Sequence, residues 1–390
     1  MTLAVDKSTW TKMRFEDFVQ NVTDRVDDPS TSGVDRYVGL EHLDPGTMVV
    51  SRWGSPDEVE AQKLRFRRGD VIFGRRRAYQ KKVARADFDG ICSAHALVLR
   101  ARPERVHPDF LPVFLSSDLF LDRAIKISVG SLSPTVNWRD LKVQEFLLPP
   151  LADQQRIADL LWSLYSDRDS RKKINDALSN LRFLAIEAVF GRIEGGRTLS
   201  DYCELDGIRI GPFGAQLHVS DYVNDGVPVV MPQDLDSGRI DVSSIKQVSE
   251  EKAQELSLYR LREGDILLPR RGDLDRRALV TEQESGWLCG TGSVRVRPKE
   301  GVNPEALILA LSSRKIVEWL ESHSTGTTMP NINAGIVAKI PVQLPDPVVV
   351  ERKLLEVRAL DDALTFIKDD LSANRAMERS LSLELFGSVV

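Results

Sequence analysis

Two kinds of hydrophobic pattern follow one another along this chain, first in one half and then again in the other. Short apolar runs bounded by Gly, Pro and Asp are typical of strands, and in the first half they predict strands at 37–43, 70–73 and 94–99. A stretch with helical spacing follows at 108–127. The second half repeats this plan, with strands predicted at 227–231, 265–268 and 292–296 and a helix at 304–322. Each half is therefore expected to form a globule with a sheet core, of the α/β or α+β class.

Each globule is expected to end in a strand marked by prolines, at 146–150 and at 342–345. In the long segment after each strand, apolar residues are separated alternately by three and four positions, which is the spacing of a coiled-coil seam. The first seam consists of Ile157, Leu160, Leu164, Ile174, Leu178, Leu181, Ala185 and Ala188, with Asp167 and Arg171 as polar members. The second consists of Val357, Leu360, Leu364, Ile367, Leu371, Leu381 and Leu385, interrupted by Asn374 and Glu378.

These two long helices can pack on each other, or each can bury its apolar stripe on its own globule. Their length favours the first arrangement, because roughly 35 residues make a helix of about 50 Å, which is longer than a globule of this size needs. A pair of such helices can hold the two globules about 34–36 Å apart or more.

The two halves are diverged copies of one sequence. Residues 65–76 match residues 260–271 at a constant offset of 195, and positions between 108 and 191 match positions between 304 and 387 at an offset of 196. A period of this length indicates duplicated domains rather than a solenoid. We predict two similar domains at 1–150 and 196–345, with helical spacers at 151–195 and 346–390. Two copies of one fold give approximate two-fold symmetry, and the best-known target with that symmetry is duplex DNA.

The net charge of −5 argues against a nucleic-acid partner at first sight, but its distribution matters more than its sum. Residues 63–85 contain ten basic residues and one acid, Asp70, and residues 260–277 contain six basic residues and four acids. Arginines beside a strand end can neutralise phosphates or bind guanine in the major groove. The alternative is a solvated charged face, and within DNA contact a phosphate is the commoner partner.

Both basic clusters supply candidate DNA-binding residues. They are Arg65, Arg67, Arg68, Arg75, Arg76, Arg77, Lys81 and Lys82 in the first half, and Arg260, Arg262, Arg270, Arg271, Arg276 and Arg277 in the second. The Gly-Asp turns that begin at Gly69 and Gly264 need no ligand and are expected to be structural. A further set, expected in loops, either reads bases or closes small cores: Trp53, Tyr79, Phe213, Gln216 and His218.

Signatures of catalysis are missing from the sequence. It contains no Asn-Pro-Pro-aromatic or Asp-Pro-Pro-aromatic string of the adenine methyltransferase kind, no glycine-rich phosphate loop and no histidines at metal-ligand spacing. A nuclease-like string, Pro345-Asp346 with Glu351-Arg352-Lys353, straddles a strand-to-helix junction and has no counterpart in the first half, so it is not favoured as a metal site. We predict no catalytic residue, no metal and no cofactor in this chain.

The sequence gives no sign of a membrane or exported protein. No apolar run reaches about 18 residues, and the first ten residues lack the apolar core of a signal peptide. The three cysteines form no CxxC pair, which fits a reduced, cytoplasmic protein. Cys92 and Cys289 lie at nearly corresponding strand positions and are expected in the cores.

The start of the first long helix carries a resemblance to a known family. The segment Leu-Pro-Pro-Leu-Ala-Asp-Gln-Gln-Arg-Ile at 148–157 resembles the start of the conserved helices in specificity subunits of type I restriction–modification systems. The Gly-Ser…Asn run at 130–138 and the Arg-Gly-Asp-Val-Ile and Glu-Gly-Asp-Ile-Leu segments at 68–72 and 263–267 are also similar to that family. The resemblance covers nearly the whole chain.

This resemblance implies a non-catalytic protein in which two target-recognition domains each read one part of a bipartite site in double-stranded DNA. It implies that the two helices form an antiparallel coiled coil that spaces these domains and docks two methyltransferase subunits, which bring S-adenosylmethionine and methylate adenine. Restriction subunits would bring Mg²⁺ and ATP-driven translocation and cleavage. The spacer and docking residues that it implies are Pro149, Pro150, Leu151, Gln154, Ile157, Leu160, Leu164, Leu178, Leu360, Leu364 and Ile367.

The second half departs from the family pattern where its long helix begins. Pro345-Asp346-Pro347 replaces the double proline, and Val349-Val350 stand where the acid-Gln pair is expected. Docking of a methyltransferase on the second helix is therefore left open. Two alternatives remain at this point. The first is a specificity-like protein outside a type I system, either a DNA-binding component of another phage-defence assembly or an orphan that blocks DNA sites. The second is a self-sufficient nuclease or methyltransferase.

Overall fold

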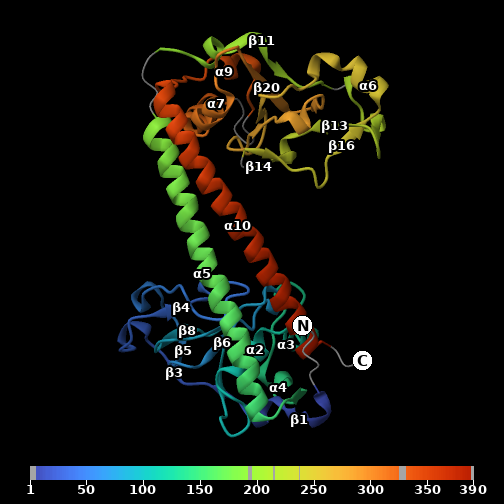
Figure 1. Ribbon diagram of the computed structural model, residues 1–390. Coiled ribbons are helices and arrows are strands. Elements are labelled where there is room, and N and C mark those ends of the chain that lie inside the picture. The colour runs from blue at the N-terminus through green and yellow to red at the C-terminus, as the bar shows by residue number, and fades with distance from the viewer. Residues whose placement is uncertain (1–5, 192–195, 214–215, 237, 325–330, 388–390) are drawn as a thin grey trace. The chain divides into compact units, whose positions relative to one another are not determined.

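The computed structural model describes residues 6–191, 196–213, 216–236, 238–324 and 331–387, and the chain in it forms two compact units (Figure 1). Unit 1 comprises residues 1–174 and 367–390, and unit 2 comprises residues 175–366. The two longest helices, α5 (Leu151–Phe190) and α10 (Pro347–Phe386), each contribute one half to each unit. Among the described residues, no helix is long and apolar enough to cross a membrane.

Unit 1 contains ten strands among its described residues, in two four-stranded sheets and one two-stranded sheet. The strands are β1 (Thr11–Arg14), β2 (Val19–Val22), β3 (Arg25–Val26), β4 (Tyr37–Val38), β5 (Lys63–Phe66), β6 (Val71–Phe73), β7 (Val83–Arg85), β8 (Gly90–Ser93), β9 (Leu97–Ala101) and β10 (Glu145–Leu148). The sheets have the orders β2-β9-β6-β7, β3-β5-β8-β4 and β1-β10. Its helices, besides its half of each long one, are α1 (Phe15–Phe18), α2 (Phe110–Ser116), α3 (Asp118–Lys126) and α4 (Trp138–Leu141).

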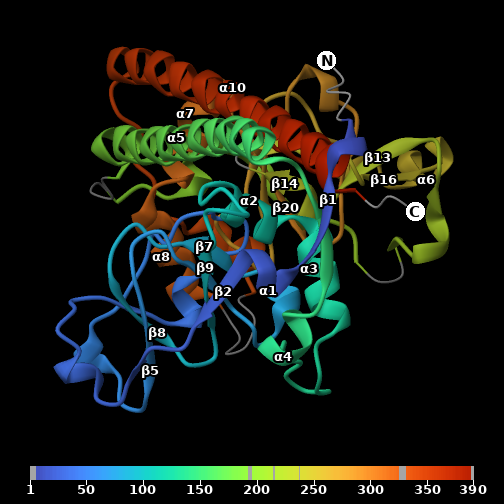
Figure 2. The ribbon, with the colours of Figure 1, turned by 90° about the horizontal axis from the view of Figure 1, so that it is seen from below.

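Aromatic side chains fill the core of unit 1. Phe15, Phe18, Phe114 and Phe120 are completely buried, and the ring of Phe146 lies 5.2 Å from that of Phe114 in an edge-on contact. Such contacts add to the gain from burying apolar area. Phe386 of α10 packs against Phe110 and Phe114 of α2, so the last turn of α10 belongs to this core. Figure 2 shows α10 running alongside α5.

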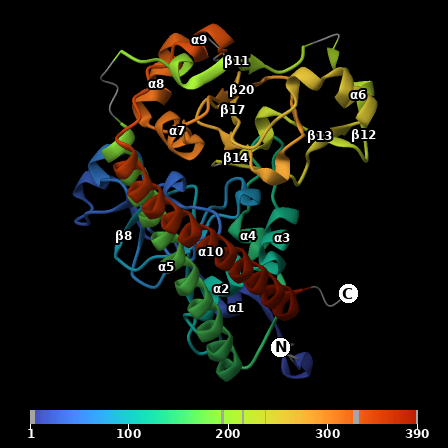
Figure 3. The same cartoon turned by 45° about the horizontal axis from the view of Figure 1, so that its top comes forward.

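Unit 2 also has two four-stranded sheets among its described residues. Its strands are β11 (Cys203–Ile210), β12 (Tyr222–Val223), β13 (Val227–Val230), β14 (Leu235–Asp236), β15 (Arg239–Ile240), β16 (Lys246–Val248), β17 (Ile266–Pro269), β18 (Ala278–Leu279), β19 (Leu288–Cys289) and β20 (Ser293–Pro298). The large sheets have the orders β11-β20-β17-β18 and β12-β16-β13-β19. Its shorter helices are α6 (Glu250–Glu255), α7 (Pro304–Leu311), α8 (Arg314–His323) and α9 (Ala334–Ala338), of which α7, α8 and α9 lie together beside β11 and β20 (Figure 3).

The two units share a topology. The sheets β2-β9-β6-β7 and β11-β20-β17-β18 have the same order and are antiparallel throughout, with Val71 opposite Leu99 in one and Ile266 opposite Val296 in the other. In the second sheets, a parallel pair recurs as β4-β8 and β13-β19, and the edges differ. The predicted class, two similar globules with sheet cores, is therefore confirmed. Cys92 and Cys289 are buried at equivalent parallel strands, as predicted, and burial raises the pKa of Cys289 to about 12.

Three of the predicted elements are wrong in detail. The helix expected at 108–127 is broken into α2 and α3, because the Ser117 hydroxyl accepts a hydrogen bond from the N–H of Phe120 and so begins a new helix. The helix expected at 304–322 is likewise broken between α7 and α8. The strand expected at 342–345 does not form: only an isolated bridge joins Pro341 to Thr198, whereas its counterpart β10 pairs with β1 over four residues.

The Gly-Asp turns hold the same buried ion pair in both units. The Asp70 carboxylate accepts both guanidinium bonds of Arg100, at 2.6 and 2.8 Å, and Asp265 does the same for Arg297, at 2.8 and 2.7 Å. Each carboxylate is almost completely buried and also accepts the backbone N–H three residues before it, at 2.8 Å. The structural role predicted for these turns is confirmed.

Within each unit, half of α5 packs antiparallel on half of α10 (Figure 1). The second predicted seam is correct, since Val357 and Leu364 are buried and the polar members Asn374 and Glu378 face inward. The first predicted seam is partly wrong: Leu160 and Leu181 are exposed, and Leu161 is buried in place of Leu160.

The inward face of α5 carries more charge than the predicted seam, in which only Asp167 and Arg171 were polar. In unit 1, Arg168 pairs with Glu378, Arg171 pairs with Asp370, and Asn374 donates to Asp167 at 2.9 Å. In unit 2, Arg182 pairs with Asp361. Burial raises the pKa of Glu378, and Arg168 opposes that rise. These pairs place complementary charges opposite one another on the two helices.

The corrected seam makes a stability prediction. Replacing Leu161 by alanine removes side-chain atoms from the core of unit 1 and is expected to lower the free energy of unfolding by about 2–4 kcal/mol. The neighbouring Leu160 is 38% exposed, so Leu160→Ala should lower it by less than about 1 kcal/mol. Urea unfolding of both variants, with hydrogen exchange to assign the transition to unit 1, measures the difference. If both variants lost the same free energy of unfolding, the seam predicted through Leu160 would be the correct one.

Candidate nucleic-acid interface

An arginine-rich loop occupies equivalent positions in the two units and is locked to a second loop in each. In unit 1, residues 74–82 join β6 to β7, and residues 75–77 pair with 134–136. The N–H of Arg77 donates to the carbonyl of Pro134 at 2.7 Å, and the N–H of Val136 donates to that of Arg75 at 2.9 Å. Arg76 bridges to Thr135. Backbone hydrogen bonds thus fix the loop, and the arginine side chains are not needed to hold it in place.

Unit 2 repeats this arrangement. Arg271 bridges to Asn331, and the N–H of Ile332 donates to the carbonyl of Arg270 at 2.9 Å. The guanidinium of Arg270 lies over the ring of Phe213, 5.0 Å from its centroid. Because the same two loops meet in both units, we treat each arginine loop with its partner loop as the candidate interface.

In unit 1 the candidate interface carries exposed cations with weak internal partners. Arg76 and Arg77 are exposed, and their side chains reach only the hydroxyl of Ser133, at 3.5 and 3.4 Å. Arg77 and Lys81 adopt left-handed backbone conformations with φ of 57° and 52°, which non-glycine residues adopt at a cost. Strain of this kind gathers at binding sites, and here it aims cations and the exposed ring of Tyr79 outward.

The remaining basic candidates of unit 1 divide into exposed and engaged side chains. Arg67 and Arg68 are exposed on the turn before β6. Arg65 donates to the carbonyl of Ser32 at 2.7 Å, and Lys82 donates to that of Leu40 at 2.6 Å. Lys81 forms a 2.6 Å ion pair with Asp118, with both side chains largely exposed. An exposed pair of this kind contributes little to stability and can open for a phosphate.

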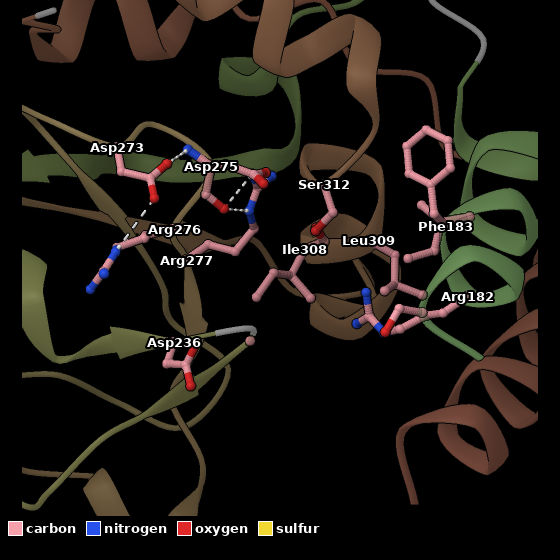
Figure 4. Close-up of a pocket in the computed structure, with 13 residues that line it drawn as sticks. Arg182, Phe183, Asp236, Asp273, Asp275, Arg276, Arg277, Ile308, Leu309 and Ser312 are labelled. Atoms are coloured by element: carbon pink, nitrogen blue, oxygen red, sulfur yellow. Dashed lines mark hydrogen bonds and ion pairs between the residues drawn. The ribbon is translucent and has the colours of Figure 1, made fainter. Parts of the chain in front are cut away.

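The structure corrects the prediction for Arg277. Its side chain is 4% exposed and donates to the carbonyl of Leu311 at the end of α7 and to the carboxylate of Asp275 (Figure 4). A guanidinium buried in this way caps a helix end and has no surface to offer DNA. Arg276 beside it is exposed and pairs with Asp273 at 3.6 Å (Figure 4).

The other candidates of unit 2 are also partly engaged. Arg260 pairs with Glu250 and donates to the carbonyl of Gly286 at 2.9 Å. Arg262 is exposed on the turn before β17. Unit 2 therefore exposes fewer unpaired cations than unit 1 at the candidate interface, which agrees with the four acids in this part of the sequence.

Loop aromatic and polar residues occupy three different settings. Trp53 is 44% exposed, and the guanidinium of Arg36 lies 4.3 Å from its ring centroid. Gln216 accepts a hydrogen bond from the hydroxyl of Tyr259 at 3.1 Å, and the N–H of His218 is held by Asp221. The sequence offered no sign of the contact between Arg36 and Trp53, because it joins residues that share no pattern.

Gln154 has a different role from the docking role that was expected. It is 1% exposed: its amide donates to the carbonyls of Pro149 and Arg105, and its carbonyl accepts the N–H of His107 at 2.8 Å. It therefore fastens α5 to its own globule and cannot contact a partner. The equivalent residue, Val350, is buried in the core of unit 2. The replacement of the acid-Gln pair by Val349-Val350 therefore changes how α10 joins its own globule.

The other spacer and docking residues are distributed over all faces of the helices. Pro150, Leu151 and Leu160 are exposed. Ile157, Leu164 and Leu360 are partly buried against the cores of their own units, Leu178 and Ile367 are partly exposed, and Pro149 and Leu364 are buried. The surface that α5 offers to a partner is thus its outward face.

Comparison with known proteins shows the family. The model of the "Type I restriction modification DNA specificity domain" matches this chain twice, at residues 8–180 and 198–349. The chain belongs to this specificity-domain family. Each matched range contains one arginine loop and the residues described as pairing with it.

Individual relatives carry the same name. The chain is 27% identical over 183 residues to the EcoDI specificity subunit of Escherichia coli, covering 45% of this chain and 40% of the relative. It is 24% identical over 260 residues to the EcoBI specificity subunit of the same species, covering 60% and 54%. The matches thus span about half the length of these relatives or less.

Solved structures show the same fold over the whole chain. The crystal structure of the type I restriction–modification S subunit from M. genitalium has a TM-score of 0.63 and 16% identity, covering 98% of this chain and 97% of that one. A structure from work on assembly and conformational transition of the type I system has a TM-score of 0.51 and 21% identity, covering 97% and 96%.

Proposed function

We propose that this specificity-domain protein reads DNA sequence as the specificity subunit of a type I restriction–modification complex. The observation that carries the proposal is the duplicated arginine loop: in each half, arginines lie on a loop whose backbone is joined to a second segment, 134–136 in one unit and 331–332 in the other. A bipartite site in double-stranded DNA matches two such readers, and base edges are read by side chains held in fixed geometry. The target-recognition domains are residues 1–150 and 196–345, and the helical spacers are 151–195 and 346–390.

The proposed contacts follow from exposure. Arg67, Arg68, Arg76, Arg77 and Lys81 in the first domain, and Arg262, Arg271 and Arg276 in the second, are exposed and placed to meet DNA. Arg65, Arg75, Lys82, Arg260 and Arg270 stay candidates with side chains that are partly buried and already bonded inside the protein. Phosphates supply most of the partners, because their contacts dominate affinity.

The proposed partners are two methyltransferase subunits on the helices, together with restriction subunits. The outward face of α5 exposes Leu160, Ile174 and Leu181, and Leu151 is exposed in its first turn. Apolar side chains at helical spacing suit a partner helix. The chain itself is proposed to be non-catalytic, with S-adenosylmethionine, ATP and Mg²⁺ bound by the partners. A cytoplasmic location follows from such a role.

A domain exchange tests the proposal. Residues 196–345 are replaced by the same region of another family member, the protein is assembled with its methyltransferase, and methylated DNA is sequenced. The expected result is that one half of the methylated motif changes while the other half is kept. A change in both halves, or in neither, would contradict modular reading. Co-purification with a partner other than a methyltransferase would place the chain in a different defence assembly.

A further inference from the structure

Two arginines face each other across neighbouring strands of unit 2 without an acid to balance them. Arg209 of β11 lies directly opposite Arg295 of β20 in the antiparallel ladder. Like charges at directly opposed positions destabilise a sheet. Arg295 is only 5% exposed, so water screens this repulsion poorly. A compensating charge is therefore expected near the pair.

No ion pair among the described residues supplies that charge. Arg295 donates to two carbonyl groups, those of Leu258 at 3.1 Å and Asp206 at 3.4 Å, which are neutral. Among the described residues no carboxylate forms an ion pair with Arg209 or Arg295. The nearby Asp265 is bonded to Arg297. Burial lowers the pKa of Arg295, and the neighbouring Arg297 and Arg209 act in the same direction, whereas the charge of Asp265 partly opposes them.

Each guanidinium group also has one N–H donor without a hydrogen-bond partner. The Nε atoms of Arg209 and Arg295 are buried and lack a partner. Burying such a donor without a bond costs free energy. Arg209 is partly exposed, so the pair can be reached from the side of Arg209. Two guanidinium groups with free N–H donors are suited to the oxygens of a tetrahedral anion.

The backbone beside the pair is irregular. The register of β11 against β20 shifts between Cys203 and Ile208, and within this bulge Asp206 has a left-handed φ of 59°. The bulge turns the carbonyl of Asp206 toward the guanidinium of Arg295. Bulges that redirect groups in this way are frequent beside functional sites.

Unit 1 shows what the fold does without such a site. By strand register, Val22 and Val98 occupy the positions of Arg209 and Arg295, since Val98 lies opposite Ile72 as Arg295 lies opposite Leu267. Both valines pack in an apolar core. The arginine pair is thus a feature of unit 2 and not a requirement of the sheet.

We propose that Arg209 and Arg295 form a binding site for a tetrahedral oxyanion, either inorganic phosphate or a backbone phosphate of bound DNA. The anion sits between the two guanidinium groups, accepts their free Nε–H donors and cancels the repulsion across the strands. The site does not depend on the proposed function, and only the DNA source of the phosphate rests on it.

Thermal unfolding of the full chain tests the site. Inorganic phosphate at about ten times its Kd should raise Tm by roughly 3–6 °C over chloride at equal ionic strength. The double variant Arg209→Val with Arg295→Val, which installs the pair of unit 1, should lose this increment and be at least as stable without phosphate. Arg314→Val, which removes an exposed arginine of α8, should keep the increment. Equal effects of phosphate and chloride, or an increment retained in the double variant, would overturn the site.

Binding to duplex DNA separates the two sources of phosphate. If a DNA phosphate occupies the site, the double variant should lower the slope of log K against log salt by about 0.9. If the slope is unchanged while the phosphate effect on Tm is lost, the occupant is free phosphate. A chain that bound no DNA would refute the proposed function and leave the thermal test untouched.

Discussion

Asp265→Ala is expected to lower the free energy of unfolding of unit 2 by about 3–5 kcal/mol, the largest effect of any single substitution considered for stability. The carboxylate accepts two bonds from Arg297 and one from the N–H of Arg262 and is 1% exposed. Its removal leaves a half-buried guanidinium without its counter-charge and a backbone donor without an acceptor. A loss of this size is a large part of the stability of an ordinary domain.

Urea unfolding with hydrogen exchange in the strands of unit 2 measures this loss. Glu263→Ala is the matched control, because Glu263 is an exposed carboxylate two residues away and should change the stability by less than about 0.5 kcal/mol. Asp70→Ala, which breaks the equivalent pair with Arg100, should give a similar loss confined to unit 1. If Asp265→Ala cost no more than Glu263→Ala, the buried pair would not stabilise the fold.

Much of the fold could be predicted from local pattern because the chain is duplicated. The strand that follows each Gly-Asp turn was predicted in both halves. Asp70 and Asp265 form equivalent ion pairs because the same turn buries both carboxylates. The break between α2 and α3 was missed because Ser117 competes for backbone bonds at a position that apolar spacing does not mark. The strand at 342–345 was missed because a strand needs a partner, and β1 has no equivalent ladder in the described part of unit 2.

The sites were harder to predict than the fold, because a sequence does not show whether a charged side chain faces solvent or the interior of the protein. Arg276 and Arg277 are neighbours, yet one is exposed and the other caps α7. Gln154 looked like a surface feature because it recurs in the family, but its three bonds are internal. Three-dimensional pairing also decides the seam of α5, in which Arg168 faces inward toward Glu378 and Leu160 faces outward.

Replacing Arg76 and Arg77 together by alanine is expected to weaken binding to duplex DNA at least tenfold at low salt. Both side chains are exposed on a loop that the 134–136 segment holds rigid, and neither has an acidic partner among the described residues. If each neutralises one phosphate, the slope of log K against log salt should fall by about 1.8, which is 0.9 for each contact. Titration of a labelled duplex at four salt concentrations measures that slope.

A control with the same change of charge separates this contact from a general effect. Arg156→Ala with Lys173→Ala removes two exposed cations from α5, where each is paired only with an acid on its own helix, and should leave the slope unchanged. A phosphate role for the arginine loop predicts equal weakening on the cognate site and on a scrambled duplex, because phosphates carry no sequence. Contact with guanine instead predicts a loss of about 1–3 kcal/mol that is confined to the cognate site. An arginine-loop variant that kept both the slope and the cognate affinity would show that the loop lies away from the DNA.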